Sequence, residues 1–150
     1  MCRDCLRRER FVGVLLLTLV LPACMAQPPA RKNAGEDFQG FWNGFRAAVL
    51  ANDQQKVAAL TQFPFKTRGV MDGDPVVSHE SAGFLKLWDK LLTQDPGLKP
   101  EPETMRQFIQ RKTRIAATDL GRTGSTARIA SFVFQKVNGR WLFTMAYVEE

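Results

Sequence analysis

Few side chains in this 150-residue sequence could carry out chemistry, and they are scattered along the chain. His79 is the only histidine, so a multi-histidine metal site is excluded, and acid–base catalysis would need a partner that the fold brings near. Tyr147 is the only tyrosine. Asp72 and Asp74 flank Gly73, which is typical of a tight turn, because an EF-hand loop is longer and ends in glutamate. We expect His79 to face solvent or to cap a helix entry.

A basic cluster is the clearest charge pattern. Within nine residues and with no acid among them stand Arg106, Arg111, Lys112 and Arg114. Anionic lipid headgroups or envelope polymers could bind such a segment, but a solvated face is the usual outcome. Only one aromatic residue, Phe108, is interleaved, so nucleic acid is not an expected partner. No nucleophile elbow, phosphate loop or dinucleotide motif occurs, and the sequence predicts no catalytic residue, no cofactor and no metal site.

The cysteines indicate where the folded part begins. Cys2, Cys5 and Cys24 are the only three, and the chain from Met25 onward has none. No internal disulfide or cysteine metal site can therefore form in that part. A body without thiols is typical of a protein that works in an oxidising compartment.

The first 26 residues have the layout of a secretory signal peptide. An arginine-rich start precedes an 11-residue apolar run, Phe11–Leu21, which is shorter than the roughly 20 residues of a membrane span. Leu21-Pro22-Ala23-Cys24 resembles a bacterial lipobox, in which Cys24 would be lipidated; the alternative is ordinary cleavage after Ala26. We expect an exported protein, either periplasmic or anchored to a bacterial envelope membrane by lipid alone. Residues 27–35, rich in proline and charge, predict a tether.

Apolar periodicity predicts the helices. Glu36–Leu50 carries one stripe at helical spacing: Phe38, Phe41, Trp42, Phe45 and Val49. Gly40 and Gly44 in this helix cost about 1 kcal/mol each relative to alanine, which predicts either close approach to a sheet or room for a ligand. Further expected helices are Gln54–Leu60 with Asp53 as N-cap, Ser81–Thr93, and a short helix from Pro102 with Met105, Phe108 and Ile109 facing inward.

Extended segments are expected between and after these helices. A run through Val70 should pair with an edge strand over Pro75–Ser78, and a strand is expected over Thr113–Thr118. The last expected feature is a hairpin over Ala127–Val148, in which Asn138-Gly139 suits a type I′ turn. That register pairs Lys136 with Trp141, Phe134 with Phe143, Phe132 with Met145 and Ala130 with Tyr147, all on one face that helices must cover.

The order of elements resembles the nuclear transport factor 2-like superfamily, which includes ketosteroid isomerase and scytalone dehydratase. The residues that carry the resemblance are the Phe41, Trp42, Phe45 stripe, the segment from Asn52-Asp53 to Phe63-Pro64, and Phe134–Trp141. The resemblance covers residues 36–150. It implies an α+β fold in which N-terminal helices pack in the concave face of a strongly curved antiparallel sheet, forming a cone-like α+β barrel. It also implies back-to-back pairing of sheets, so a homodimer is an expected assembly.

Two functions are compatible with the sequence. The first is a non-catalytic envelope domain whose cone binds a small apolar or amphipathic ligand, or an envelope partner protein. The expected pocket lining is Phe41, Phe45, Phe132, Phe134, Trp141 and Tyr147. The alternative is an isomerase, dehydratase or hydrolase, which would need Asp37, Arg114 or Tyr147 beside His79 inside the cone. The catalytic groups of ketosteroid isomerase, a carboxylate base with a tyrosine and a protonated aspartic acid, have no counterpart here.

Overall fold

The computed structural model describes residues 34–97 and 102–149, with side chains from Asp37 onward. The predicted signal peptide, the lipobox with Cys24, and the predicted tether except for its last two residues lie outside the described residues. The elements in chain order are α1 (Ala34–Leu50), α2 (Gln54–Ala59), β1 (Thr61–Gly69), β2 (Val76–His79), α3 (Ser81–Thr93), α4 (Met105–Arg111), the 3₁₀ helix η1 (Ala117–Asp119), β3 (Thr126–Ile129), β4 (Phe132–Val137) and β5 (Arg140–Val148).

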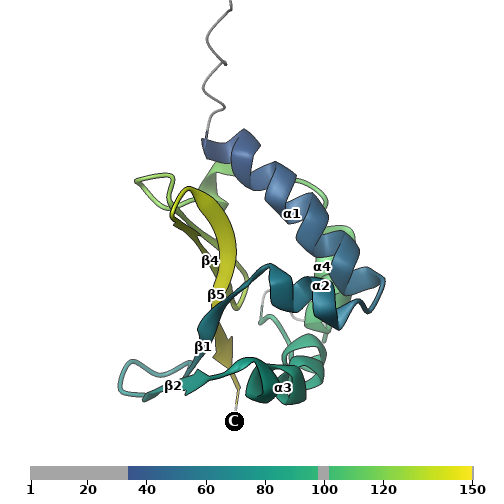
Figure 1. Cartoon of the computed structure of the whole chain (residues 1–150), viewed down its shortest axis with the longest axis vertical. Helices are drawn as coiled ribbons and strands as arrows, with labels where there is room; N and C mark the ends of the chain where they lie inside the picture. Colours follow the sequence, from purple (N-terminus) through teal and green to yellow (C-terminus); the bar gives the residue numbers. More distant parts are fainter. Residues whose placement is uncertain (1–33, 98–101, 150) are drawn as a thin grey trace, which may run out of the picture. The chain divides into compact units, whose positions relative to one another are not determined.

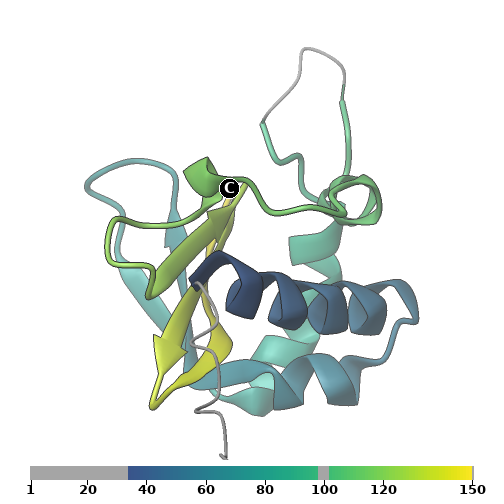
Figure 2. The ribbon, with the colours of Figure 1, turned by 90° about the horizontal axis from the view of Figure 1, so that it is seen from above.

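The fold is α+β, with one five-stranded sheet in the order β2-β1-β5-β4-β3 and the α-helices against one face of it (Figure 1). Two parts of the expectation were wrong. The sheet is mixed rather than antiparallel, because β1 runs parallel to β5, and it is open rather than a barrel, because β2 and β3 remain at its two edges. The view from above shows α1 and α3 on the same side of the strands (Figure 2). No helix of the described residues is both long and apolar enough to cross a bilayer.

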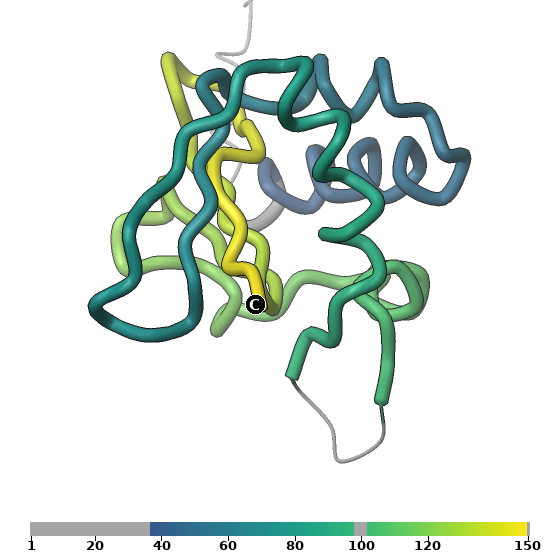
Figure 3. The backbone as a smooth tube through the Cα atoms, turned by 90° about the horizontal axis from the view of Figure 1, so that it is seen from below, coloured from purple at the N-terminus to yellow at the C-terminus, as the bar shows by residue number. Residues whose placement is uncertain are grey.

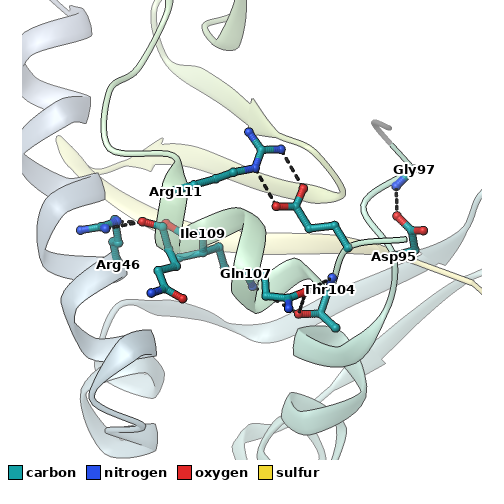
Figure 4. Close-up of polar contacts among 9 residues, drawn as sticks. Arg46, Asp95, Gly97, Thr104, Gln107, Ile109 and Arg111 are labelled. Carbon is teal, nitrogen blue, oxygen red and sulfur yellow. Dashed lines mark hydrogen bonds and ion pairs between the residues drawn. The ribbon is translucent and has the colours of Figure 1, made fainter. Parts of the chain in front are cut away.

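The local sequence signals are confirmed in most helices. Asp53 caps α2 by accepting a hydrogen bond from the Lys56 N–H at 2.9 Å. The α3 helix has the predicted bounds, and α4 buries the three residues expected to face inward: Met105, Phe108 and Ile109. The cap of α4 is Thr104, which forms a capping box with Gln107 (Figure 4).

The register of the β4–β5 hairpin is confirmed near its turn and changes further along. Asn138 and Gly139 have φ of 49° and 80°, as the type I′ turn requires, and Phe134 pairs with Phe143. Beyond that pair the register shifts, and Phe132 pairs with Ala146 instead of Met145. The shift leaves one extra residue, Thr144, on β5, so the pairing expected for Phe132 was wrong.

The run expected to form the first half of this hairpin is itself a hairpin. β3 pairs antiparallel with β4, so that Ala127 lies opposite Phe134 and Ile129 opposite Phe132. Ala130 lies in the connecting turn with φ of 53°, and therefore does not pair with Tyr147 as expected. Two short strands therefore replace the one long strand that was expected. The turn between them could not be predicted, because its position carries neither glycine nor asparagine.

The strand expected over Thr113–Thr118 is absent because its backbone finds other partners. Side chains of α1 bind the backbone of residues 109–115, as Figure 4 shows for Arg46. The bonds are Gln39 Nε2 to Thr113 O (3.0 Å), Ile115 N to Gln39 Oε1 (2.8 Å), Trp42 Nε1 to Lys112 O (2.7 Å) and Arg46 Nε to Ile109 O (2.9 Å). Within the expected strand, α1 thus binds the Thr113 carbonyl and the Ile115 N–H, and Asp119 Oδ2 accepts the Ala116 N–H at 2.6 Å, so these groups need no neighbouring strand.

The helix glycines do not mark a close approach to the sheet, contrary to one of the two expectations. A Cβ atom at Gly40 or Gly44 would meet no atom within 4 Å beyond its chain neighbours and its own helix backbone. Gly69 is different, because a Cβ there would overlap the side chain of Asp74. The helix glycines therefore carry their conformational cost without a packing reason.

Substituting these glycines should change stability in opposite directions. Gly40→Ala and Gly44→Ala should each raise the free energy of unfolding by about 1 kcal/mol, because alanine is the better helix former and has room. Gly69→Ala, the matched control in a crowded position, should lower it by about 1 kcal/mol or more. Denaturant unfolding measures all three, and a loss of stability in Gly44→Ala would show that this helix face contacts something in the folded protein.

Candidate functional site

Five of the six side chains expected to line a pocket form the packed core instead. Phe45, Phe132 and Phe134 are fully buried, Trp141 is buried, and Phe41 is half-buried. The Phe45 ring centroid lies 5.2 Å from that of Phe134 and 5.3 Å from that of Phe143. Rings at these separations are in contact, so they fill the space between α1 and the sheet.

The sixth residue, Tyr147, lies elsewhere. The extra residue in β5 turns Ala146 and Val148 toward the core, so Tyr147 and Met145 point to the other face of the sheet. Tyr147 lines a surface groove with a volume of about 480 Å³. The groove is formed by the β3–β4 turn, the end of β5, the β1–β2 loop and the segment after α3, with the lining residues Val70, Gln94, Asp95, Pro96, Gly97, Thr118, Arg128, Ala130, Ser131, Tyr147 and Glu149.

Arg128 is the main charged group of this groove. Its guanidinium carbon lies 4.5 Å from the centre of the Tyr147 ring, and its Nε donates to the Ala130 carbonyl at 3.0 Å. The ring and the carbonyl hold the guanidinium in a fixed orientation. Its two terminal nitrogens have no hydrogen-bond partner among the described residues. Arg128 therefore presents a planar donor group to the groove.

Gln94 fixes one wall of the groove to the sheet. Its Nε2 donates to Ser131 Oγ at 2.9 Å and to the Tyr147 carbonyl at 2.8 Å, and its main-chain carbonyl accepts from the Met105 N–H at 2.8 Å. One side chain thus joins the end of α3 to β5 and to the β3–β4 turn. The Oε1 atom of Gln94 is buried and has no partner in the described part of the chain, and because solvent does not reach it, it is not a ligand contact as it stands.

Asp95 and Glu149 also line the groove, and they differ in whether their carboxylates are hydrogen-bonded within the protein. Asp95 Oδ1 accepts the Gly97 N–H at 2.8 Å (Figure 4), so this carboxylate already stabilises the local turn. Glu149 is exposed and has no partner among the residues that the structure describes. The strongest unengaged donor of the groove is therefore Arg128, beside an aromatic ring and the apolar side chains of Val70 and Pro96.

The residues that the alternative hypothesis of an enzyme requires lie in different places. Asp37 Oδ2 binds Lys136 Nζ at 2.5 Å and Trp141 Nε1 at 3.1 Å, near the β4–β5 turn. His79 Nε2 is hydrogen-bonded to Thr67 Oγ1 at 2.8 Å on β1, and Arg114 lines a separate surface pocket with Gln39 and Asn43. The structure therefore does not bring Asp37, His79, Arg114 and Tyr147 into one cavity. Across the described ranges, no group of three or more His, Cys, Asp or Glu side chains could hold a metal ion.

The basic cluster is mostly engaged within the protein. Arg111 pairs with Glu103 through two bonds of 2.6 and 2.7 Å (Figure 4), and the hydrogen bond to Glu103 raises the pKa of the guanidinium. Lys112 pairs with Asp119 at 2.8 Å, and Arg106 donates to the Leu50 carbonyl at 3.3 Å. Of the four bases, Arg114 alone has no such partner among the described residues. The cluster mainly stabilises the path of residues 103–119 and does not form a single anion-binding surface.

Comparison of the chain with protein-family models, with curated proteins and with solved structures finds no match.

Arg128 and Gln94 were not expected to form a site. Arg128 is a single basic residue in a strand, and Gln94 follows a helix, so neither belongs to a motif. A partial signal existed in the aromatic pattern, because Tyr147 was expected beside the β3–β4 segment. The extra residue in β5 reversed its direction, and a change of that kind leaves no trace in residue spacing.

Truncating a ring tests whether the predicted pocket is a core. Phe45→Ala should lower the free energy of unfolding by about 3–5 kcal/mol, because it leaves a cavity among packed rings. Phe41→Ala is the matched control on the same helix, and it should cost clearly less because Phe41 is half-buried. Denaturant unfolding compares them, and a cost below about 1 kcal/mol for Phe45→Ala would mean that the ring lines an open pocket.

Proposed function

We propose that this protein is an exported, non-catalytic domain of a bacterial envelope that binds a small amphipathic ligand. The binding site is the groove beside Arg128 and Tyr147. The single observation that carries the proposal is that five of the six expected pocket residues pack as core, while Tyr147 joins Arg128 in a groove of about 480 Å³. The ligand therefore binds at the surface of the sheet and not inside the domain.

The proposed fold class is the nuclear transport factor 2-like superfamily, with the sheet wrapped around α1 as a cone. The order of α1, α2, the β1–β2 hairpin, α3 and three final strands supports this class. The helices α4 and η1 stand between α3 and these strands, and the first of the three is β3 instead of the strand expected over Thr113–Thr118. The register irregularities in β1 and β5 support the curvature, because a bulge bends its strand and increases its twist. The contacts of Phe45 and Trp42 with Phe134 place α1 against the centre of the β4–β5 hairpin.

The ligand class follows from the chemistry of the groove. The open end of the Arg128 guanidinium can donate two parallel hydrogen bonds, which suits a carboxylate, sulfonate or phosphate. Val70, Pro96 and Tyr147 line the same groove and offer apolar contacts. An amphipathic anion uses both. The non-catalytic part of the proposal is supported by the dispersal of the ionisable residues described above.

The proposed binding is tested with 8-anilinonaphthalene-1-sulfonate, an aromatic anion whose fluorescence reports on apolar contact. Arg128→Gln should weaken binding of this probe by about tenfold, since a charge-assisted hydrogen bond contributes about 1.5–3 kcal/mol, less some loss to solvent. Arg140→Gln is the matched control, because Arg140 is also exposed and lies at the other end of β5. No probe binding by the folded protein, or equal affinity in both variants, would contradict the proposal that the groove is a ligand-binding site.

Export and anchoring are tested at Cys24. In a bacterial host, Cys24→Ala should abolish labelling by an alkyne analogue of palmitate and release the protein from the membrane fraction. Cys5→Ala, a control in the same leader, should leave the labelling unchanged. If the wild-type protein carries no label and its mature N-terminus is Gln27, cleavage after Ala26 replaces the lipid anchor. A mature protein that retains residues 1–23 would exclude both forms of processing.

A further inference from the structure

The exposed large hydrophobic side chains of the described chain all belong to one hairpin. Val70 and Met71 lie in the β1–β2 loop and are 64% and 69% exposed, and Val76 and Val77 lie on β2 and are 54% and 48% exposed. Single exposed apolar residues are common on protein surfaces, but a group on one projecting element is typical of an interaction site. Figure 3 shows this loop reaching away from the helices.

The strand that carries two of these valines is an unprotected sheet edge. β2 pairs with β1 on one side, from Phe65 opposite His79 to Arg68 opposite Val76, and no other strand of the described sheet lies beyond it. In an antiparallel ladder, alternate residues direct their backbone N–H and C=O groups outward. Natural edge strands are usually blocked by a lysine, a proline or a bulge. Val76–His79 contains none of these, and Pro75 precedes it.

The loop beside this edge is held in a defined shape. Asp74 accepts the Met71 N–H at 2.8 Å through its carboxylate, and the Asp74 N–H donates to the Met71 carbonyl at 3.1 Å. Arg68 Nη2 also donates to the Asp72 carbonyl. A surface that is already ordered loses less conformational entropy when a partner binds to it.

The charges around β2 select the kind of partner. Asp72 and Asp74 precede the strand and Glu80 follows it, and no lysine or arginine occurs between Val70 and Ala82. The nearest bases in the hairpin, Lys66 and Arg68, lie on β1; the Arg68 guanidinium reaches the loop at the Asp72 carbonyl, where Asp72 and Asp74 outnumber it by two charges to one. The edge is therefore apolar in the middle and negative at both ends.

This pattern disfavours two other occupants. If β2 paired with β2 of a second copy around a two-fold axis, Asp74 of one copy would lie near Glu80 of the other, and like charges opposite each other are destabilising. Insertion of the loop into a lipid surface would carry Asp72 and Asp74 toward headgroups, which are anionic in many bacterial membranes. Both arrangements place negative charge against negative charge.

We propose that the outer edge of β2 binds an extended segment of a partner protein, with apolar residues at its centre and lysine or arginine at its ends. The segment adds a strand to the sheet: its backbone pairs with the outward groups of β2, its apolar side chains contact Val76 and Val77, and its basic ends face Asp72, Asp74 and Glu80. This protein-binding edge is a second site, and it does not depend on ligand binding in the groove.

Two synthetic peptides test the proposal with the full-length protein. The acetylated and amidated peptide Lys-Lys-Val-Val-Val-Lys-Lys, which presents valine to both faces of the sheet, should bind about tenfold more tightly than Glu-Glu-Val-Val-Val-Glu-Glu, because opposite-charge cross-strand pairs contribute a few tenths of a kcal/mol to 1 kcal/mol each. NMR titration should place the amide shifts in residues 76–79 and in the adjoining loop. Equal affinity of the two peptides, or shifts confined to other elements, would overturn the proposal.

Variants separate the strand contact from the charge contact. Val77→Lys should abolish binding of the basic peptide, because a cation on the edge repels it. Because Val77 is exposed, the substitution should leave the thermal unfolding temperature unchanged, which shows that the fold is intact. Asp72→Asn with Glu80→Gln should remove the preference for the basic peptide. The control Asp89→Asn, an exposed acid on α3, should change nothing. If the wild-type protein is a dimer and Val77→Lys dissociates it, the edge binds a second copy instead. If the wild-type protein sediments with phosphatidylglycerol vesicles and Val77→Lys does not, the edge binds lipid instead.

Discussion

The packing of the α1 rings against the β4–β5 hairpin is the interaction on which the rest of the structure depends. Phe45 contacts Phe134 and Phe143, and Phe38 lies 4.7 Å, centroid to centroid, from Trp141. Burying aromatic rings provides a large share of the hydrophobic stabilisation available to a domain of this size. Because the rings fill the space between helix and sheet, the proposed binding sites lie at the surface.

The polar contacts of α1 reinforce this packing. Trp42 buries its ring in the core while its Nε1 donates to the Lys112 carbonyl, and Asp37 binds both Lys136 and Trp141 at the start of the helix. One helix therefore holds the hairpin with its apolar face and residues 109–115 with its polar side chains. These contacts satisfy backbone groups of residues 112–115, which belong to no helix or strand.

A single extra residue in β5 determines which face of the sheet carries Tyr147. With a regular register, Tyr147 would face the rings, and its hydroxyl would need a partner in an apolar interior. The irregularity opposite Val133 turns Ala146 inward and places Tyr147 beside Arg128 on the other face. Val70 lines the same groove and is also one of the exposed residues of the β1–β2 hairpin, so the groove and the β2 edge adjoin at this residue.

The sequence by itself determined the local structure, because caps, turns and apolar periodicity act over a few neighbouring residues. The α1 stripe, the Asp53 cap, the bounds of α3 and the Asn138-Gly139 turn could all be predicted for that reason. The tertiary structure alone decided the parallel pairing of β1 with β5, the irregularity at Thr144 and the contacts that replace a strand at residues 113–118. These features depend on groups far apart in the chain. Arg128, Gln94 and Tyr147 could not be grouped from sequence, because their proximity follows from the register of three separate segments.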